Sequence, residues 1–218
     1  MIKIIGLILI LFAFCSSDGF AQFAGDGSYI WNLTSITYSV NDKTDLVISN
    51  KDHYSNQNDH FDYFHFDLIA YHEISKKFTL GLGLRQTESF KSNRWNPGQT
   101  YMLYGVYFWH PDNMIVRFAN RLASKTYKTS NTQYGLDNIT NIDFFVRSTN
   151  KLPKPFLMGE LFTNINFQKV QTARLYGGFR LIRSKYVGID IYYCYQKTRP
   201  TWEWKNYNVL GVNTKVRI

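Results

Sequence analysis

Adjacent aspartate and histidine residues are the side chains of this sequence best suited to acid–base chemistry. Asp52 precedes His53, and Asp59 precedes His60, at the two ends of one polar stretch. An imidazole held by a carboxylate can act as a general base that activates a nucleophile or a water molecule. The sequence has neither a Gly-x-Ser-x-Gly nor a His-Glu-x-x-His pattern. A lipase or protease site built on these pairs is therefore a hypothesis that rests on adjacency alone.

Metal and nucleic-acid binding have weaker support. His53, Asp59 and His60 offer ligand atoms for a metal ion, but their spacing matches no specific metal-binding motif. The basic residues, which give a formal net charge of +9, are spread singly along the chain without a basic helix or an RNA-binding motif. We expect no metal, no cofactor, no established catalytic residue and no nucleic-acid partner.

Charged residues also occur at alternate positions of apolar segments, most clearly between Thr172 and Tyr195. There, two alternating segments are joined by the polar turn Arg183–Tyr186. Period-two alternation is typical of a β-strand with one apolar and one polar face. Each segment has about ten residues, enough for a tilted strand to cross a bilayer. A soluble sandwich or lipocalin-like barrel, with the apolar face inward, is the alternative interpretation.

Similar segments recur along the chain, and the connections between them fall into two classes. Outer-membrane barrels have short periplasmic turns and longer external loops. This sorting favours a membrane barrel over a soluble one. The predicted short turns are Ser75–Lys77, Pro111–Asn113, Asn150–Pro155 and Arg183–Tyr186, and the predicted long polar loops include Glu88–Gln99 and Thr126–Asp137.

The beginning of the sequence is typical of an exported protein. Lys3 is followed by the apolar run Ile4–Phe14, and Gly19 and Ala21 supply the small residues of a cleavage site. We predict a signal peptide over residues 1–21, cleaved after Ala21, and a single barrel domain over residues 22–218 in the outer membrane. Cys15 raises a lipoprotein signal as the alternative, although Phe14 stands where such signals carry a small residue.

The predicted fold is all-β, a closed antiparallel up-and-down transmembrane β-barrel. Closure is required because an open sheet edge cannot face lipid. About eleven segments can be counted, but bacterial barrels normally have an even number, so we predict ten or twelve strands and favour twelve. The last segment, Tyr207–Ile218, alternates to its end and resembles the signal read by the barrel-assembly machinery, although Ile218 replaces the usual aromatic residue.

Lipid around such a barrel would force charged side chains inward, since an Arg or Lys facing lipid at mid-depth costs about 2–4 kcal/mol. The charges then either satisfy one another in a structural barrel or line a narrow channel. Bases outnumber acids, which favours a small anionic solute. The predicted lumen-lining residues are Asp67, Arg85, Arg117, Arg121, Asp143, Arg147, Glu160, Arg174, Arg180, Asp190 and Lys215.

Aromatic residues make up 17% of the chain and suit both strands and membrane interfaces. We expect those near strand ends to form girdles at the two membrane surfaces, with outer-membrane lipid as the partner. These residues are Tyr29, Trp31, Tyr101, Trp109, Tyr193, Tyr195 and Tyr207.

Three stretches together carry a family resemblance. Trp31, the aromatic segment Phe61–Tyr71 and the sequence FTLGLGLRQT (Phe78–Thr87) resemble the domain-of-unknown-function 2490 family. Members of that family have signal peptides, come mainly from Bacteroidetes bacteria and form outer-membrane β-barrels. The resemblance covers nearly the whole chain after the predicted cleavage site. It implies a fold and a location, but no reaction.

Overall fold

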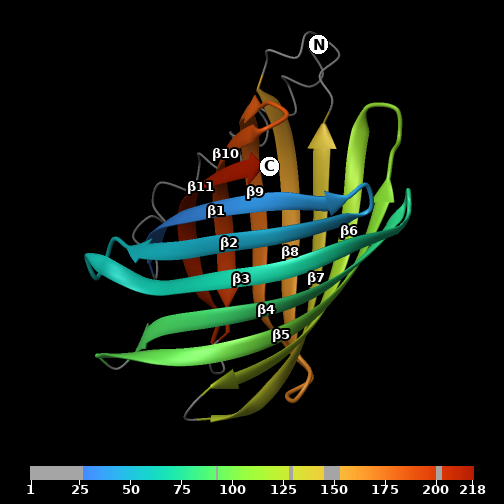
Figure 1. Cartoon of the computed structure of the whole chain (residues 1–218). Coiled ribbons are helices and arrows are strands. Elements are labelled where there is room, and N and C mark those ends of the chain that lie inside the picture. Colours follow the sequence, from blue (N-terminus) through green and yellow to red (C-terminus); the bar gives the residue numbers. More distant parts are fainter. Residues whose placement is uncertain (1–26, 92, 128–129, 145–152, 200–202) are drawn as a thin grey trace.

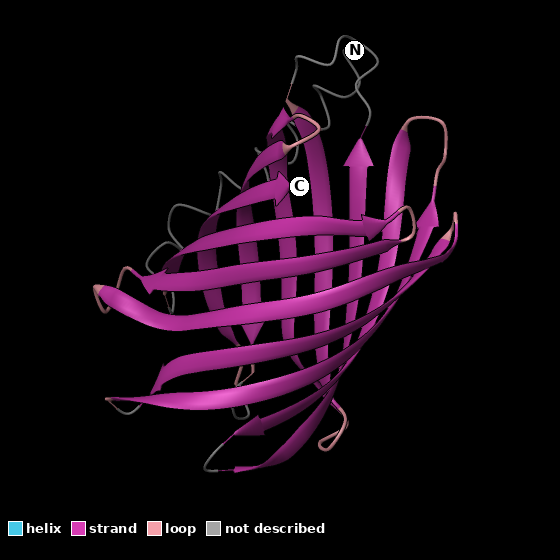
Figure 2. Ribbon diagram, viewed as in Figure 1, coloured by secondary structure: helices cyan, strands magenta, loops and turns pink. Residues whose placement is uncertain are grey.

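The residues that the structure describes form a closed β-barrel of eleven strands (Figures 1 and 2). The structure is a computed structural model that describes residues 27–91, 93–127, 130–144, 153–199 and 203–218. The predicted signal peptide and its cleavage site lie outside these ranges. The strands are β1 (Ser28–Asn41), β2 (Thr44–Ser55), β3 (His60–Ser75), β4 (Phe78–Lys91), β5 (Arg94–Trp109), β6 (Met114–Tyr127), β7 (Ser130–Phe144), β8 (Lys154–Asn164), β9 (Lys169–Arg183), β10 (Val187–Thr198) and β11 (Lys205–Arg217).

The order of the strands confirms the predicted up-and-down meander, since each strand pairs with its neighbours in the chain and β11 returns to β1. In Figure 1 the strands β1–β5 run across the front of the barrel, while β8–β10 stand upright behind them. This crossing of the two walls is the tilt that closes a twisted sheet into a barrel. In the described ranges, no helix is both long enough and apolar enough to span a membrane.

The number of strands corrects the prediction of ten or twelve antiparallel strands. Successive strands of a meander reverse direction, so with eleven strands the first and the last run the same way. Strands β1 and β11 accordingly pair in parallel, from Ser28 opposite Asn208 to Thr37 opposite Arg217, whereas the other pairs are antiparallel. A parallel ladder is only slightly less stable per residue than an antiparallel one, so it closes the barrel and removes both free edges.

Two segments predicted as long polar loops are strand instead. Most of Glu88–Gln99 belongs to the hairpin of β4 and β5, and most of Thr126–Asp137 belongs to that of β6 and β7. The predicted turns at 75–77, 111–113 and 183–186 do join successive strands at one end of the barrel. The fourth turn, Asn150–Pro155, lies partly outside the described residues. Connections at the other end, such as 56–59 and 165–168, are equally short, so connection length does not distinguish the two ends.

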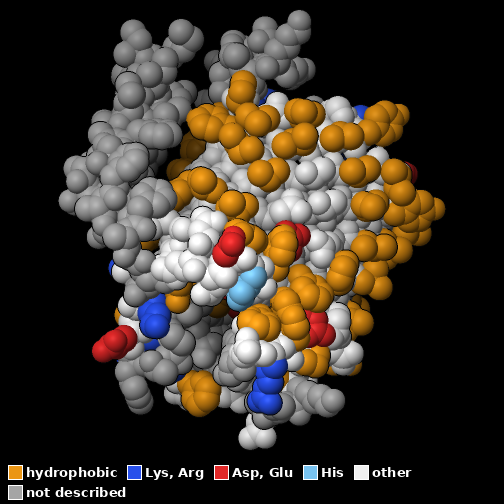
Figure 3. All heavy atoms as spheres, turned by 90° about the vertical axis from the view of Figure 1, so that its left-hand side faces the viewer, with side chains coloured by type: hydrophobic (Ala, Val, Ile, Leu, Met, Phe, Trp, Pro, Cys, Tyr) orange, Lys and Arg blue, Asp and Glu red, His pale blue; other side chains and the backbone are white. Residues whose placement is uncertain are grey.

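Burial alternates along the strands and separates an inner from an outer face. In β5, Met102 and Tyr104 are buried, whereas Tyr101 and Leu103 are exposed on the opposite face. The outer face is rich in large apolar side chains, and Figure 3 shows few charged groups among them over the upper part of that view. Outward apolar residues include Ile36, Ile48, Phe66, Leu68, Leu82, Leu84, Leu122, Leu161, Leu175 and Leu210.

Large side chains on the inner face are matched by glycines on neighbouring strands. Tyr192 of β10 stands opposite Gly178 of β9 and Gly211 of β11. A Cβ atom on either glycine would collide with Tyr192. The glycines therefore make room for an aromatic cluster inside the barrel. This cluster consists of Trp31, Phe156, Tyr176, Tyr192, Cys194 and Val209.

Replacing Gly211 with alanine is expected to lower the free energy of unfolding by about 1–3 kcal/mol, because the new methyl group overpacks the Tyr192 ring. Gly159→Ala is the matched control, since nothing lies within 4 Å of the position its Cβ would take. Urea titration followed by tryptophan fluorescence compares the two variants. Equal stability of the two variants would contradict the packing described for Tyr192.

Candidate functional site

Two ion pairs between neighbouring strands lie inside the barrel. Arg85 of β4 donates through Nε and Nη2 to the two carboxylate oxygens of Asp67 on β3, at 2.7 and 2.8 Å. Arg121 of β6 binds Asp137 of β7, with its Nε 2.7 Å and its Nη2 2.5 Å from Asp137 Oδ2. Each pair joins residues that stand directly opposite in the strand register. Opposite charges at such positions stabilise the pairing of the two strands.

A third ion pair has additional polar partners. Arg174 of β9 lies 3.2 Å from Glu160 of β8 and donates through Nε to Gln196 of β10 at 2.5 Å. The Tyr176 hydroxyl donates to the same Glu160 oxygen at 2.8 Å. We call the three pairs Asp67–Arg85, Arg121–Asp137 and Glu160–Arg174 the charged belt. All of its carboxylates bind a guanidinium, so the belt is largely self-neutralising.

A separate cluster lies nearer the end of the barrel that carries the connection 184–186. Arg180 of β9 contacts Asp143 of β7 across the intervening strand β8, and it donates to Asp190 of β10 at 2.9 Å. Lys215 of β11 donates to the same Asp190 carboxylate at 2.6 Å. This cluster ties together strands from β7 to β11.

Nine of the eleven predicted lumen residues take part in these ion pairs. Arg117 stands opposite Phe108 and Asn141 on the inner face, but its side chain is exposed and joins no ion pair in the described part of the chain. Arg147 lies outside the described residues. Asp137 was missed because it was assigned to a polar loop, although the alternation of β7 continues through it.

Trp31 corrects the prediction of a membrane girdle, because it lies inside the barrel and is only 1% exposed. Lys51 Nζ is 3.8 Å from the centre of its ring, and the Arg174 guanidinium is 4.8 Å away. Tyr29 and Tyr207, also assigned to a girdle, meet each other edge to face at 5.5 Å. The sequence contains the pattern that predicts an inward Trp31. Ile30 and Ile36 are apolar and face outward, so the odd-numbered residues of β1 face inward.

Aromatic and imidazole rings connect the charged belt from β3 to β1. His65 Nε2 is 3.5 Å from Asp67, and its Nδ1 is 2.9 Å from the Tyr63 hydroxyl. Tyr63 stacks on His53 at 4.5 Å, and His53 stacks on Trp31 at 4.3 Å. Since Trp31 also contacts Arg174, a continuous path of contacts joins two of the ion pairs through the interior.

A family model described as "Protein of unknown function (DUF2490)" matches residues 29–207. The chain belongs to the DUF2490 family. The match runs from β1 to the start of β11, and so includes the charged belt and the residues around Trp31. It confirms the resemblance drawn from Trp31, Phe61–Tyr71 and Phe78–Thr87. No curated protein matches the chain.

The first Asp–His pair of this DUF2490 protein, Asp52 and His53, is separated by the barrel wall. His53 lies on the inner face between Trp31 and Tyr63, whereas Asp52 is hydrogen-bonded to Asn32 on the outer face at 3.3 Å. Adjacent residues of a strand point to opposite faces, so Asp52 cannot orient the His53 ring. Among the residues described here, no group of three or more His, Cys, Asp or Glu side chains is arranged to hold a metal ion.

The second pair, Asp59 and His60, is engaged elsewhere. Asp59 accepts a hydrogen bond from the Tyr54 hydroxyl. The His60 ring packs edge to face against Phe90, with ring centres 4.9 Å apart, and its Nδ1 lies 3.1 Å from the Phe61 carbonyl oxygen. Neither side chain is arranged as the oriented base of a nucleophile.

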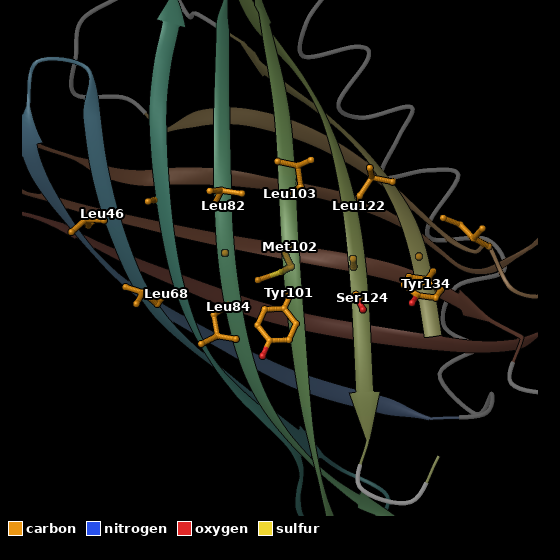
Figure 4. A pocket seen from close by; sticks show the side chains of 15 residues that line it. Leu46, Leu68, Leu82, Leu84, Tyr101, Met102, Leu103, Leu122, Ser124 and Tyr134 are labelled. Carbon is orange, nitrogen blue, oxygen red and sulfur yellow. The ribbon is translucent and has the colours of Figure 1, made fainter. Parts of the chain in front are cut away.

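The outer wall of the DUF2490 barrel carries an apolar hollow of about 690 Å³ across β2–β7 (Figure 4). Leu46, Leu68, Leu82, Leu103 and Leu122 contribute side chains to it, and Ser124 and Tyr134 supply hydroxyl groups near one end. None of its fifteen lining residues is charged. The hollow therefore suits hydrocarbon, while the charges lie on the opposite face of the same wall.

Proposed function

We propose that this DUF2490 protein is a structural outer-membrane β-barrel, exported by a cleavable signal peptide, whose lumen is filled by ion-paired side chains. The observation that carries the proposal is the opposite polarity of the two faces of the wall. Leu68, Leu82 and Leu84 are exposed on the outer face, while Asp67 and Arg85 pair on the inner face of the same two strands. A soluble barrel would have the reverse arrangement.

Strand length supports a bilayer as the surroundings. The strands have from 11 residues in β8 to 16 in β3 and β5. A tilted strand needs about 9–11 residues to cross a membrane. The extra residues of the hairpins formed by β4–β5 and β6–β7 would then project beyond the lipid, which accounts for their polar composition. Outer-membrane lipid is the partner of the apolar face, and the barrel-assembly machinery would engage β11.

The contacts within the lumen favour a structural barrel over an open pore. The guanidinium of Arg174 on β9 reaches the Trp31 ring on β1, which is three strands away around the barrel. Arg121 and Arg174 lie 5.9 and 4.6 Å from the ring of Phe162 on β8. Side chains from several strands thus meet in the interior of the barrel and occupy part of its lumen.

A small channel for an anionic solute is the second candidate, favoured by unpaired positive charge. Lys51 and Lys125 stand on the inner face, and in the described ranges neither lies within 4.0 Å of a carboxylate. A lipase or protease site has no comparable support, because neither Asp–His pair is arranged as the oriented base of a nucleophile. No surface feature of the described residues favours nucleic acid.

Planar-bilayer recording separates the two candidates. We expect the purified, refolded barrel to give no stepwise current, because the belt side chains occupy the lumen. Anion-selective current steps that become smaller in the Arg174→Ala variant would instead support the small channel. Arg217→Ala is the control for a general loss of charge, since the Arg217 side chain is 56% exposed at the end of β11.

A further inference from the structure

We propose that the inner wall formed by β1 and β2 holds a binding site for a small oxyanion at Lys51, Trp31 and His53. The site deepens the proposed function, since it lies in the lumen of that barrel and names the chemistry of the ligand that the lumen would hold. Three features of this region support the site: an uncompensated cation, buried polar atoms without partners among the described residues, and access for a small molecule.

Lys51 is the uncompensated cation. Its ammonium group lies over the Trp31 ring at 3.8 Å. In the described part of the chain no carboxylate lies within 4.0 Å of it, and the Glu160 carboxylate is held by Arg174 and Tyr176. A charge in such surroundings is stabilised when it gains an opposite charge, and the guanidinium of Arg174 adds a second positive group on the same ring.

The buried groups without partners point to the same place. Trp31 is only 1% exposed, yet its indole Nε1 has no hydrogen-bond partner among the described residues. His53 Nε2, on the ring stacked against Trp31 at 4.3 Å, is also buried and has no partner in the part of the chain that the structure describes. Leaving a buried polar group unsatisfied costs about 1–3 kcal/mol. An anion beside Lys51 would accept hydrogen bonds from the indole N–H and from an imidazole N–H at once.

Asn213 distinguishes an oxyanion from a halide. Its side-chain Oδ1 is also buried with no hydrogen-bond partner among the described residues, and it lies on β11 opposite Leu33, two residues along the strand from Gly211, the register partner of Trp31. A carbonyl oxygen only accepts hydrogen bonds. Phosphate that retains one hydroxyl group can accept from Trp31 and His53 and donate to Asn213, whereas chloride cannot donate.

Small molecules can reach the belt. The side chain of Arg174 is 19% accessible and that of Glu160 is 13% accessible. Lys51 and His53 are likewise only partly buried. These side chains are therefore not closed off from solvent, and an anion bound beside them would supply hydrogen bonds in place of water.

Calorimetric titration of the full, refolded barrel with inorganic phosphate in a chloride-free buffer tests the site. We expect saturable binding by the wild type and at least tenfold weaker binding by Lys51→Met, which keeps the apolar stem over Trp31 and removes the charge. Tenfold corresponds to about 1.4 kcal/mol. Trp31→Phe, which keeps a ring but loses the indole N–H, is expected to weaken binding several-fold. Arg117→Met removes an inner-face charge far from Trp31 and is expected to bind within twofold of the wild type.

The outcomes of this titration are separate from those of the proposed function. Heat-modifiable migration on gels establishes that each variant is a folded barrel before the titration. The site is wrong if the folded wild type shows no saturable phosphate binding, or if Lys51→Met and Arg117→Met bind equally well. Either result leaves the membrane barrel intact. A wild type that binds phosphate but is recovered as a soluble periplasmic protein would retain the site and overturn the membrane assignment.

Discussion

Replacing Asp137 with alanine is expected to lower the free energy of unfolding by about 3–5 kcal/mol, because it leaves the Arg121 charge uncompensated inside the barrel. Asp137 is only 1% exposed, and Arg121 is 8% exposed. The neutral hydroxyl of Tyr104, 3.4 Å from Arg121 Nη1, cannot replace the lost carboxylate. Urea titration of the refolded barrel, followed by tryptophan fluorescence, measures the change.

A surface ion pair supplies the matched control. Asp45 binds Arg217 at 2.7 Å, but the two side chains are 32% and 56% exposed. Asp45→Ala is therefore expected to cost less than about 1 kcal/mol. The double variant Arg121→Met with Asp137→Leu is expected to recover much of the stability, since it removes both buried charges together. If Asp137→Ala and Asp45→Ala have equal effects, the belt is not a buried stabilising element.

Replacing Leu82 with arginine is expected to destabilise the folded barrel in lipid by about 2–4 kcal/mol. Leu82 is 67% exposed on the outer face of β4, and it stands opposite Ala70 and Leu103 in the register. In a bilayer its position away from the strand ends places the new charge among acyl chains. The free energy of unfolding from lipid vesicles and the yield of assembled protein in the outer membrane both report this cost.

The depth of the substituted residue in the membrane distinguishes a lipid bilayer from any other apolar covering of the outer face. Ile74 is 55% exposed and lies beside the connection 76–77, so an arginine there would be near the membrane surface. Ile74→Arg is expected to cost only about 0–1 kcal/mol in lipid. Similar small effects of Leu82→Arg and Ile74→Arg would contradict a bilayer around the outer face.

Much of the barrel could be predicted because alternation is a local property of the sequence. A strand with one face in an apolar medium needs apolar residues at every second position, whatever its partners are. Leu80, Leu82 and Leu84 alternate with Gly81, Gly83 and Arg85, so the faces of β4 followed from the sequence alone. The same alternation assigns the predicted lumen-lining charged residues to the inner face of their strands.

The closure of the barrel could not be predicted in this way. Whether β1 meets β11 in parallel or another strand completes the sheet depends on hydrogen bonds between the two ends of the chain, which no local pattern encodes. About eleven segments can be counted in the sequence, but the even number usual in bacterial barrels favours ten or twelve strands. The described barrel has eleven strands and a parallel seam.

Polar stretches were the other source of error. Asp137 lies in the segment Thr126–Asp137, predicted as a loop, and Lys51 lies in a strand with few apolar residues. Both residues follow the period-two pattern of their strands, but where the outward residues of a strand are also polar, the two faces do not differ in hydrophobicity and the pattern is hard to detect. Lys51 meets Trp31 across the neighbouring strands β1 and β2, but the second cation on that ring, Arg174, comes from β9, which is distant in the sequence, so its contact depends on the tertiary structure.

Fractionation of cells that produce the full chain tests whether this barrel lies in the outer membrane. We expect the protein, shortened by its signal peptide, to be found in the outer-membrane fraction and to remain there after washing with urea. We also expect it to migrate faster on gels before heating than after, as a folded barrel does. Recovery of the mature protein as a freely soluble periplasmic monomer would contradict the account.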